Sequence, residues 1–374
     1  MTPGQHADSL ALLSLDFPPN DGGISRLVGG MTQALHEAGC NTTVVTFEAA
    51  GREGLPRPPA RYIEVPRRKG LRDWALFRAV RALKPGTPIL TSVWNPEAAL
   101  ALLAGKRRIS ILAHGNEVMR YKGQSLKARL RRFVLERAHV VICNSHFTEG
   151  LVRDIAPGAR THVLNPAVDA AAFEPPVSKV QAREALDLPP GKRLVLTVAR
   201  LDPIKGHDTV LRALSQLPEA ERSAIHYLIV GSGGERPRLK ALALELGVSD
   251  QVQFAGFVAD AELPLWYTAA DVFCLCSVVD KTRRGMEGFG MSLTEAQAAG
   301  LPVIGSRSGG ITDAVKEGAG GWLIEEQDSA ALAQHLSHLV AAPEAFAAQG
   351  KLGAARIRRE MNWASYAARI RSIV

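Results

Sequence analysis

Two cationic side chains lie close together in the C-terminal half of the chain, directly after a predicted buried strand. Arg200 follows the strand expected over residues 194–198, and Lys205 lies in a proline-containing loop next to Gly206. Two cations at one strand end suit a diphosphate group, because hydrogen bonds between cationic side chains and phosphate oxygens are strong. The alternative is that both are ordinary surface cations.

A glycine-rich loop further along the chain carries a carboxylate, Glu287. Three glycines surround it in sequence, so this carboxylate has no evident structural task, whereas carboxylates accept hydrogen bonds from sugar hydroxyls. We expect a helix to begin at about Ser292, and the N–H groups at a helix start can approach an anion or a hydroxyl. The residues expected to offer them are Gly288, Phe289, Gly290 and Met291.

Glu295 has two interpretations that the sequence leaves open. The residues from Ser292 to Glu295 match the S-x-x-E capping box, in which the glutamate bonds back to the serine N–H. The other interpretation is that Glu295 binds a ligand.

Three further positions follow predicted strands. Gly23 belongs to a glycine pair that opens the first helix, and Gly231 begins a Gly-Ser-Gly-Gly loop. This loop lacks the third glycine of a dinucleotide-binding fingerprint, which disfavours an NAD-dependent oxidoreductase. His114 follows the strand over residues 109–113, where it is either a ligand contact or a structural histidine.

The elements that must position these residues alternate between strand-length apolar runs and segments of helical period. This alternation predicts parallel sheets with helical crossovers, an α/β fold. In the first half we expect strands over residues 9–15, 42–47, 88–93, 109–113, 140–143 and 161–164. In the second half we expect strands over residues 194–198, 227–230, 252–255, 272–276, 302–305 and 322–324.

The alternation breaks over residues 165–190, which predicts two doubly wound, Rossmann-like domains over residues 1–168 and 169–354. The last segment, about residues 355–374, has helical period, and we expect it to pack back on the first domain. Ligands of open parallel sheets bind beyond the carboxyl ends of the strands. We therefore expect the suggestive residues of both domains to face one central cleft.

Length and composition exclude several other classes of protein. The chain has 374 residues, of which 46% are hydrophobic and 22% charged, as in globular proteins of two domains. Its longest apolar run, residues 98–104, is far shorter than the ~20 residues of a membrane-spanning helix. The N-terminus lacks the pattern of a signal peptide. Four scattered cysteines predict a reduced, cytoplasmic protein, with Cys274 and Cys276 as core residues and no metal site.

Positive charge is concentrated in the first half. Residues 61–140 contain 18 Lys and Arg against 5 Asp and Glu, although the whole chain carries only +8. Residues 125–137 predict an amphipathic helix whose apolar side is Leu126, Leu130, Phe133 and Val134. This helix is either a solvated outer helix or a patch for anionic lipid or an acidic acceptor. Nucleic acid is the least favoured partner, because no nucleic-acid motif accompanies the charge.

Taken in order, these motifs resemble the retaining GT-B glycosyltransferases of family GT4, and bacterial mannosyltransferase-type members in particular. The resemblance rests on RLDPIKG from Arg200, VGSG from Val230, FAGFV from Phe254, and Glu287-x7-Glu295 followed by AGLPVI and Ser-Gly-Gly from Ser308. It extends over the whole chain. It implies that the second domain binds a nucleotide-sugar and the first domain binds the acceptor.

The resemblance also implies a role for each candidate residue. Arg200 and Lys205 would bind the diphosphate, Glu287 would bind the sugar hydroxyls and Glu295 the ribose. Gly231 would belong to the donor site, and Val258 and Leu263 would flank the base. From the first domain, Gly23 would contact the phosphates and His114 the sugar.

The activity implied is metal-independent hexosyl transfer with retention of anomeric configuration and without a protein nucleophile. Fixed cations and N–H dipoles would stabilise the charge that develops on the leaving diphosphate. We predict transfer of a hexose, with mannose from GDP-mannose preferred, to a lipid-linked or glycan acceptor, and no cofactor. The alternatives are a nucleotide-sugar 2-epimerase on the same fold and a sugar-nucleotide binding protein without turnover.

Overall fold

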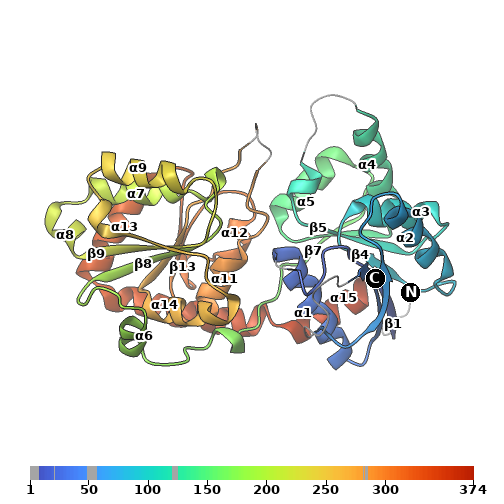
Figure 1. Cartoon of the computed structure of the whole chain (residues 1–374), viewed down its shortest axis with the longest axis horizontal. Coiled ribbons are helices and arrows are strands. Elements are labelled where there is room, and N and C mark those ends of the chain that lie inside the picture. The colour runs from blue at the N-terminus through green and yellow to red at the C-terminus, as the bar shows by residue number, and fades with distance from the viewer. Residues whose placement is uncertain (1–7, 21, 49–56, 120–124, 281, 283–284) are drawn as a thin grey trace. The chain divides into compact units, whose positions relative to one another are not determined.

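The computed structural model describes residues 8–20, 22–48, 57–119, 125–280, 282 and 285–374. The chain forms two compact units (Figure 1). The first unit comprises Met1–Ala167 together with Trp363–Val374, and the second comprises Val168–Asn362. Each unit is built on its own parallel sheet with helices on both faces.

The first unit contains a seven-stranded sheet in the order β3-β2-β1-β4-β5-β6-β7, and every pairing is parallel. Its strands are β1 (Ser9–Leu13), β2 (Asn41–Phe47), β3 (Arg61–Val65), β4 (Ile89–Thr91), β5 (Ile109–Ala113), β6 (Val140–Cys143) and β7 (Thr161–Val163). Its helices are α1 (Gly23–Glu37), α2 (Leu71–Ala82), α3 (Ala99–Leu103), α4 (Leu126–Arg137), α5 (His146–Ile155) and α15 (Trp363–Ile373). Two short helical turns, η1 (Trp94–Ala98) and η2 (Asn116–Val118), follow β4 and β5.

Strand alternation divides the core of this unit between the two faces of the sheet. Leu10 and Leu12 of β1 pack with α1 and α15, whereas Ala11 and Leu13 belong to the cluster that includes residues of α2, α4 and α5. The expected return of a C-terminal helix to this unit is seen in α15, whose Tyr366 and Ile370 are buried in the first of these clusters.

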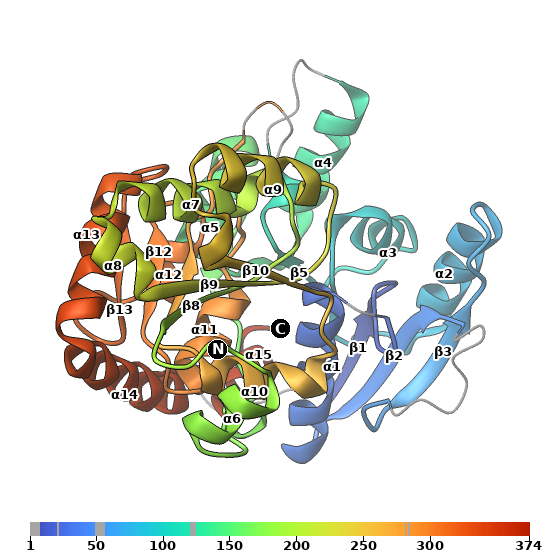
Figure 2. The ribbon, with the colours of Figure 1, turned by 60° about the vertical axis from the view of Figure 1, so that its left-hand side comes forward.

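Strand β3 was not expected from the sequence. It pairs only with β2, at the edge of the sheet (Figure 2), and of its residues RYIEV only Val65 is buried. An edge strand needs no continuous apolar run, so a strand in a basic, proline-containing segment gives little signal.

Helix α4 is turned differently from the amphipathic orientation expected of it. Val134 is buried as predicted, but Leu126, Leu130 and Phe133 are 82%, 43% and 51% exposed. Arg131 faces inward beside Val134 and Leu135, and its guanidinium donates to the carbonyl oxygens of Glu117 (3.2 Å) and Met119 (2.6 Å). Those carbonyls lie at the end of η2 and draw this one arginine inward, whereas Leu126, Leu130 and Phe133 stay exposed beside the other basic side chains of the helix.

The second unit contains all six of its expected strands, in the parallel order β10-β9-β8-β11-β12-β13. They are β8 (Arg193–Val198), β9 (Ile225–Val230), β10 (Val252–Gly256), β11 (Val272–Leu275), β12 (Val303–Ser306) and β13 (Gly321–Ile324). Its helices are α6 (Lys179–Ala185), α7 (His207–Gln216), α8 (Glu219–Ser223), α9 (Arg236–Glu245), α10 (Leu263–Ala269), α11 (Met291–Ala298), α12 (Ile311–Ala314), α13 (Ser329–Ala341) and α14 (Pro343–Glu360). Short helical turns include η4 (Pro203–Lys205).

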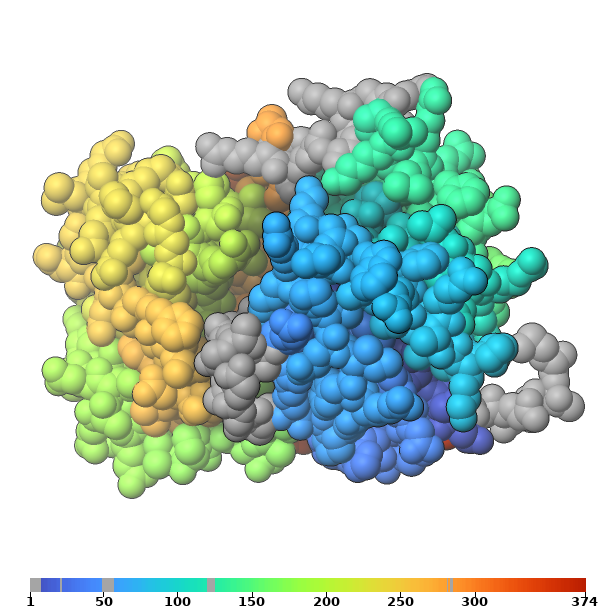
Figure 3. All heavy atoms as spheres, turned by 45° about the vertical axis from the view of Figure 1, so that its right-hand side comes forward, coloured from blue at the N-terminus to red at the C-terminus, as the bar shows by residue number. Residues whose placement is uncertain are grey.

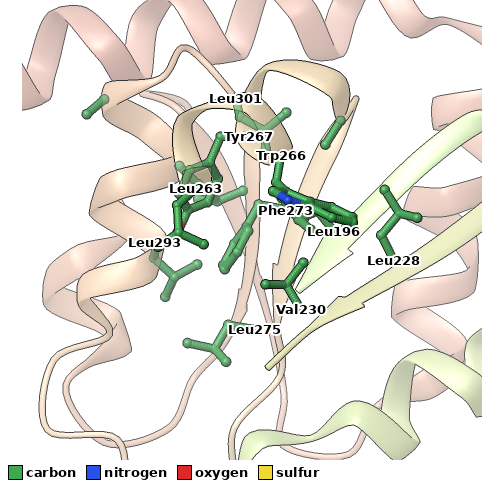
Figure 4. Close-up of a cluster of buried hydrophobic side chains, with 14 of the residues drawn as sticks. Leu196, Leu228, Val230, Leu263, Trp266, Tyr267, Phe273, Leu275, Leu293 and Leu301 are labelled. Atoms are coloured by element: carbon green, nitrogen blue, oxygen red, sulfur yellow. The ribbon is translucent and has the colours of Figure 1, made fainter. Parts of the chain in front are cut away.

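One core of this unit lies between the sheet and helices α10 and α11. Figure 4 shows Leu196 and Leu228 of neighbouring strands packed with Trp266 of α10 and Leu293 of α11. The opposite face of the sheet buries Cys274 and Cys276 among aliphatic side chains, which confirms both as core residues.

Two segments differ from the predicted division of the chain. The stretch over which the alternation was expected to break, residues 165–190, contains α6, whose N-cap residue Ser178 forms a capping box. The expected C-terminal segment 355–374 is not one element. Helix α14 ends at Glu360 in the second unit, and α15 begins at Trp363 in the first.

Candidate functional site

An ion pair joins two loops at the carboxyl edge of the second sheet. The ammonium of Lys205, at the end of η4 after β8, lies 2.6 Å from an Oε of Glu287 in the loop after β11. The two side chains are only 15% and 16% exposed, so this pair is less screened by water than a surface pair. The structure therefore brings two of the predicted site residues, 82 positions apart, into direct contact.

Gly206 holds the Lys205 loop against the end of β11. Its backbone is left-handed (φ 69°), and a Cβ there would lie 1.8 Å from the carbonyl oxygen of Cys276. The Val278 N–H donates to the Ile204 carbonyl over 2.9 Å, which adds a backbone link between the same two segments. Lys205 is thus positioned by backbone contacts on both sides.

The backbone of Glu287 is fixed by the loop after β12, which contains the Ser-Gly-Gly motif. The Gly310 N–H donates to the Glu287 carbonyl over 2.9 Å. A Cβ on Gly309 would lie 2.2 Å from the same carbonyl oxygen, so only glycine permits this approach. The Ser-Gly-Gly motif therefore positions the loop that carries the Glu287 carboxylate.

Arg200 differs from Lys205 in being open to solvent. Its side chain is 77% exposed, and the ion pair given for it is a long one, 4.0 Å, to Asp202. The loop after β9 contacts the backbone on both sides of Arg200. The Leu201 N–H donates to the Ser232 carbonyl over 2.9 Å, and Gly231 packs against the carbonyl of Ala199. Arg200 is therefore a cation on a fixed backbone with its guanidinium available to an anion.

A buried histidine that the sequence analysis did not single out lies behind these two cations. His207 begins α7, and its imidazole contacts the Tyr227 hydroxyl (3.1 Å) and the Arg200 carbonyl (3.4 Å). Burial lowers the pKa of His207 to about 4, so the ring is neutral at physiological pH. It adds no charge to the site and packs against the loop that carries Arg200.

The loop after Glu287 leads into α11 earlier than expected. Gly290, with φ 90°, is the N-cap residue, and the helix begins at Met291 rather than Ser292. Ser292 is therefore inside the helix, and the capping-box interpretation of Glu295 is wrong. Gly288 and Met291 are half-exposed, whereas the side chain of Phe289 is buried, so any ligand contact of Phe289 must come from its backbone.

Glu295 belongs to α11, and its side chain faces α10. It is 3% exposed, and the hydroxyl of Tyr267 donates to its carboxylate over 3.0 Å. Leu263, at the start of α10, is 4% exposed and belongs to the core, whereas Val258 is half-buried. The ligand contacts expected of these three residues stay predictions.

In the first unit, His114 and Gly23 lie at the carboxyl edge of the sheet, as expected from their place after strands. Gly23 is the first residue of α1. His114 follows β5, and its Nε2 is 2.8 Å from the Ser92 carbonyl oxygen in the segment after β4. The His114 N–H donates to a Glu117 carboxylate oxygen over 2.6 Å, and Asn144 Nδ2 donates to its carbonyl over 3.1 Å. One hydrogen bond thus orients the imidazole, and the other two hold the backbone of His114.

A buried carboxylate, Glu97 of η1, organises this edge and was missed in the sequence. It is 1% exposed and accepts hydrogen bonds from the Leu15 N–H (2.9 Å), the Val93 N–H (2.8 Å) and the Ser92 hydroxyl. One side chain therefore ties the segment after β1 to the segment after β4, whose Ser92 carbonyl contacts His114. A glutamate beside an alanine- and leucine-rich run was the available signal.

Burial has the largest effect on the pKa of Glu97. Desolvation raises the pKa of its carboxyl from the ordinary 4.5 to about 7, against the hydrogen bonds from Leu15, Val93 and Ser92, which favour the ionised form. Over the described ranges, no group of three or more His, Cys, Asp or Glu residues is arranged to hold a metal ion.

Comparisons with known proteins identify the family of the chain. The family model for glycosyl transferases group 1 matches residues 178–355, and the model for glycosyltransferase family 4 matches residues 21–172. A GDP-mannose-dependent alpha-(1-6)-phosphatidylinositol monomannoside mannosyltransferase of Mycolicibacterium smegmatis is 30% identical, with 98% of each chain covered. The chain belongs to family 4 of the glycosyltransferases, and it is a glycosyltransferase.

Solved structures show the same fold. The sucrose-phosphate synthase of Thermosynechococcus elongatus matches with a TM-score of 0.78 and 26% identity over 98% of both chains. The Anabaena protein Alr3699/HepE, in complex with UDP, matches with a TM-score of 0.79 and 19% identity over 97% of this chain and 98% of that one. The predicted GT-B class, with two Rossmann-like domains, is confirmed.

The close approach at Gly206 predicts a difference between two glycines of nearly equal backbone angle. Gly206→Ala and Gly247→Ala both place a side chain at positive φ, which costs about 1–2 kcal/mol. Gly247 has open space around its Cβ position, so only Gly206→Ala adds about 1–3 kcal/mol of overpacking. Urea unfolding of both variants measures the difference, and equal losses would contradict the packing described.

The raised pKa of Glu97 predicts how stability depends on pH. Between pH 4.5 and about 7 the unfolded chain releases the Glu97 proton, whereas the folded chain keeps it. The contribution of Glu97 to the free energy of unfolding is therefore full below pH 4.5 and is lost as the pH rises through 7. At about 1.4 kcal/mol per pKa unit the loss is roughly 3 kcal/mol. Glu97→Gln does not titrate, so its free energy of unfolding relative to wild type rises by that amount over the interval. A pH-independent difference between the two proteins contradicts the assignment.

Proposed function

We propose that the protein transfers mannose from GDP-mannose, with retention of configuration, to a lipid-linked or glycan acceptor. The observation that carries the proposal is the contact between Lys205 and Glu287 beside the solvent-exposed Arg200. The two cations, Arg200 and Lys205, suit the diphosphate of a nucleotide-sugar, and the Glu287 carboxylate at the same sheet edge suits the hydroxyls of its sugar. The relative in Mycolicibacterium smegmatis, similar over nearly the whole chain, is named as GDP-mannose-dependent, which supports the donor.

In this proposal, Lys205 and Arg200 bind the diphosphate of the donor and Glu287 binds its sugar. The Lys205 ammonium has three N–H donors, so it can keep its bond to Glu287 and still donate to a phosphate oxygen. Arg200 adds a second, planar donor set for the diphosphate. Glu287 then keeps one carboxylate oxygen for the sugar hydroxyls, with the N–H groups of Gly288 to Met291 nearby in sequence.

The remaining predicted residues complete the proposed donor site. Glu295 would accept from the ribose hydroxyls, Val258 and Leu263 would lie beside the base, and Gly231 would border the phosphates. Gly23 and His114 would contribute from the first unit.

The proposed chemistry needs stabilisation of charge more than it needs a nucleophile. As the sugar–phosphate bond breaks, positive charge grows on the sugar and negative charge on the diphosphate. Arg200 and Lys205 stabilise the diphosphate, and a fixed cation of this kind is worth several kcal/mol in a barrier. The leaving phosphate oxygen can take the proton of the acceptor hydroxyl on the same face, which gives retention. In this proposal two side-chain cations perform the task of a metal ion, and no cofactor is required.

The acceptor proposal rests on the first unit. Helix α4 exposes Leu126, Leu130 and Phe133 next to Lys127 and Arg132, and an exposed basic and apolar helix suits the interface of an anionic membrane. We propose peripheral contact of this unit with a membrane that contains the acceptor. No helix in the described part of the chain is long and apolar enough to cross a membrane.

The proposal predicts which nucleotide-sugar is the preferred donor and what the loss of the Glu287 carboxylate does to transfer. Incubation with a panel of GDP- and UDP-linked hexoses and a membrane extract should release nucleoside diphosphate fastest from GDP-mannose, and NMR should show an α-linked product. Glu287→Gln should lower kcat by about 100-fold or more while GDP still binds. The matched control is Arg212→Ala, an exposed cation of α7, which should keep full activity.

Three results would contradict the proposal. Transfer at the wild-type rate by Glu287→Gln would remove its role. A β-linked product would exclude retention. Conversion of the donor to an epimer without acceptor would favour a 2-epimerase.

A further inference from the structure

Apolar side chains gather on the surface of three helices of the first unit. Helices α2, α3 and α4 lie on the face of that unit shown in Figure 3. Each carries large apolar residues that are at least 43% exposed: Leu71, Trp74, Leu103, Leu126, Leu130 and Phe133. Large apolar side chains that are exposed on several helices of one unit are typical of a surface that contacts a lipid or a partner.

A cavity of about 820 Å³ opens among these helices. It lies between α3 and α4, with η1 and one residue of α2 at its sides. Most of its lining is aliphatic or aromatic, from Leu100, Leu102, Leu103, Leu130, Phe133 and Val134. These apolar side chains offer no hydrogen bonds to water, so this part of the cavity suits an apolar ligand.

Three cations line the same cavity: Lys106, Arg107 and Arg137. Lys106 donates to the Leu83 carbonyl over 2.8 Å, and the guanidinium of Arg137 stacks on the Phe133 ring at 5.1 Å. Asp73 also contributes to the lining, but its carboxylate is paired with Arg72 at 2.7 Å. The cavity thus combines an apolar interior with an excess of positive charge.

We propose that this cavity binds one acyl chain of an anionic lipid, whose phosphate is bound by Lys106, Arg107 and Arg137. The two parts of the lining match the two parts of such a molecule, an apolar chain and a negative head. Trp74, stacked under Arg78 at 4.7 Å, and Phe133 are aromatic side chains of the kind that lie at a membrane interface. The proposal deepens the membrane contact proposed above and rests on it.

A bound chain differs from a flat membrane contact in a measurable way. Each methylene that enters an apolar cavity tightens binding by about fourfold, until the cavity is full. A surface contact needs a bilayer and shows no such limit for single lipid molecules. The charge of the lining adds a second signature, preference for an anionic head over a neutral one.

The test uses the full chain and lysophosphatidylglycerols of increasing chain length, kept below their micelle concentrations, in isothermal titration. We expect one lipid per chain, affinity that rises about fourfold per methylene and then levels off. Lysophosphatidylcholine of equal length should bind about tenfold more weakly or worse. No saturable binding, or equal affinity for both lipids, overturns the proposal.

Variants separate the cavity from the surface around it. Ala99→Trp fills the cavity and keeps every charge, and Leu130→Glu places a charge in its lining at an exposed position. Both should lose the dependence on chain length, whereas Leu244→Trp, at a 74% exposed leucine of α9, should not. Wild-type affinity in both cavity variants overturns the proposal.

GDP affinity serves as the independent readout. It should be unchanged in the two cavity variants, because Arg200 and Lys205 belong to the second unit, and the cavity of the first unit is lined by neither Gly23 nor His114. Lipid binding without GDP binding would remove the proposed donor and leave the cavity proposal standing.

Discussion

The ion pair between Lys205 and Glu287 is the interaction on which the proposed donor site depends. It joins the loop after β8 to the loop after β11, two neighbouring strands of the second sheet. Because both side chains are largely shielded from water, their attraction is stronger than that of a surface pair. In the proposed donor site, Lys205 would orient the carboxylate toward the sugar hydroxyls, and Glu287 would hold the ammonium within reach of the diphosphate. One interaction sets the position of both chemical groups.

Backbone contacts give this ion pair its precision. The parallel sheet delivers the ends of β8, β11 and β12 to one edge, and glycine permits the following loops to touch through their main chains. Gly206 lies against Cys276, and Gly309 against Glu287. Any side chain at these positions would push the loops apart. In the first unit, the buried carboxylate of Glu97 also joins two segments that follow strands. It accepts hydrogen bonds from one donor in the segment after β1 and from two in the segment after β4.

The sequence predicts best what depends on local pattern. Continuous apolar runs located all six strands of the second sheet, and Arg200, Lys205 and Glu287 lie in loops after β8 and β11, as the sequence pattern predicts. It predicts poorly what depends on partners distant in the chain. Strand β3 is defined by its pairing with β2, and α4 is turned by the bonds of Arg131 to carbonyls of another segment. Glu295 matched a local capping motif, yet Gly290 starts the helix and Tyr267 of α10 contacts the carboxylate.

The most direct measurement of the central claim is the affinity of the protein for GDP and for GMP. If Arg200 and Lys205 bind the diphosphate, wild type should bind GDP about tenfold or more tightly than GMP, since a hydrogen bond to a charged group contributes about 1.5–3 kcal/mol. Arg200→Ala should lose most of that preference and keep its affinity for GMP. An unchanged ratio of the two affinities in Arg200→Ala would contradict the account.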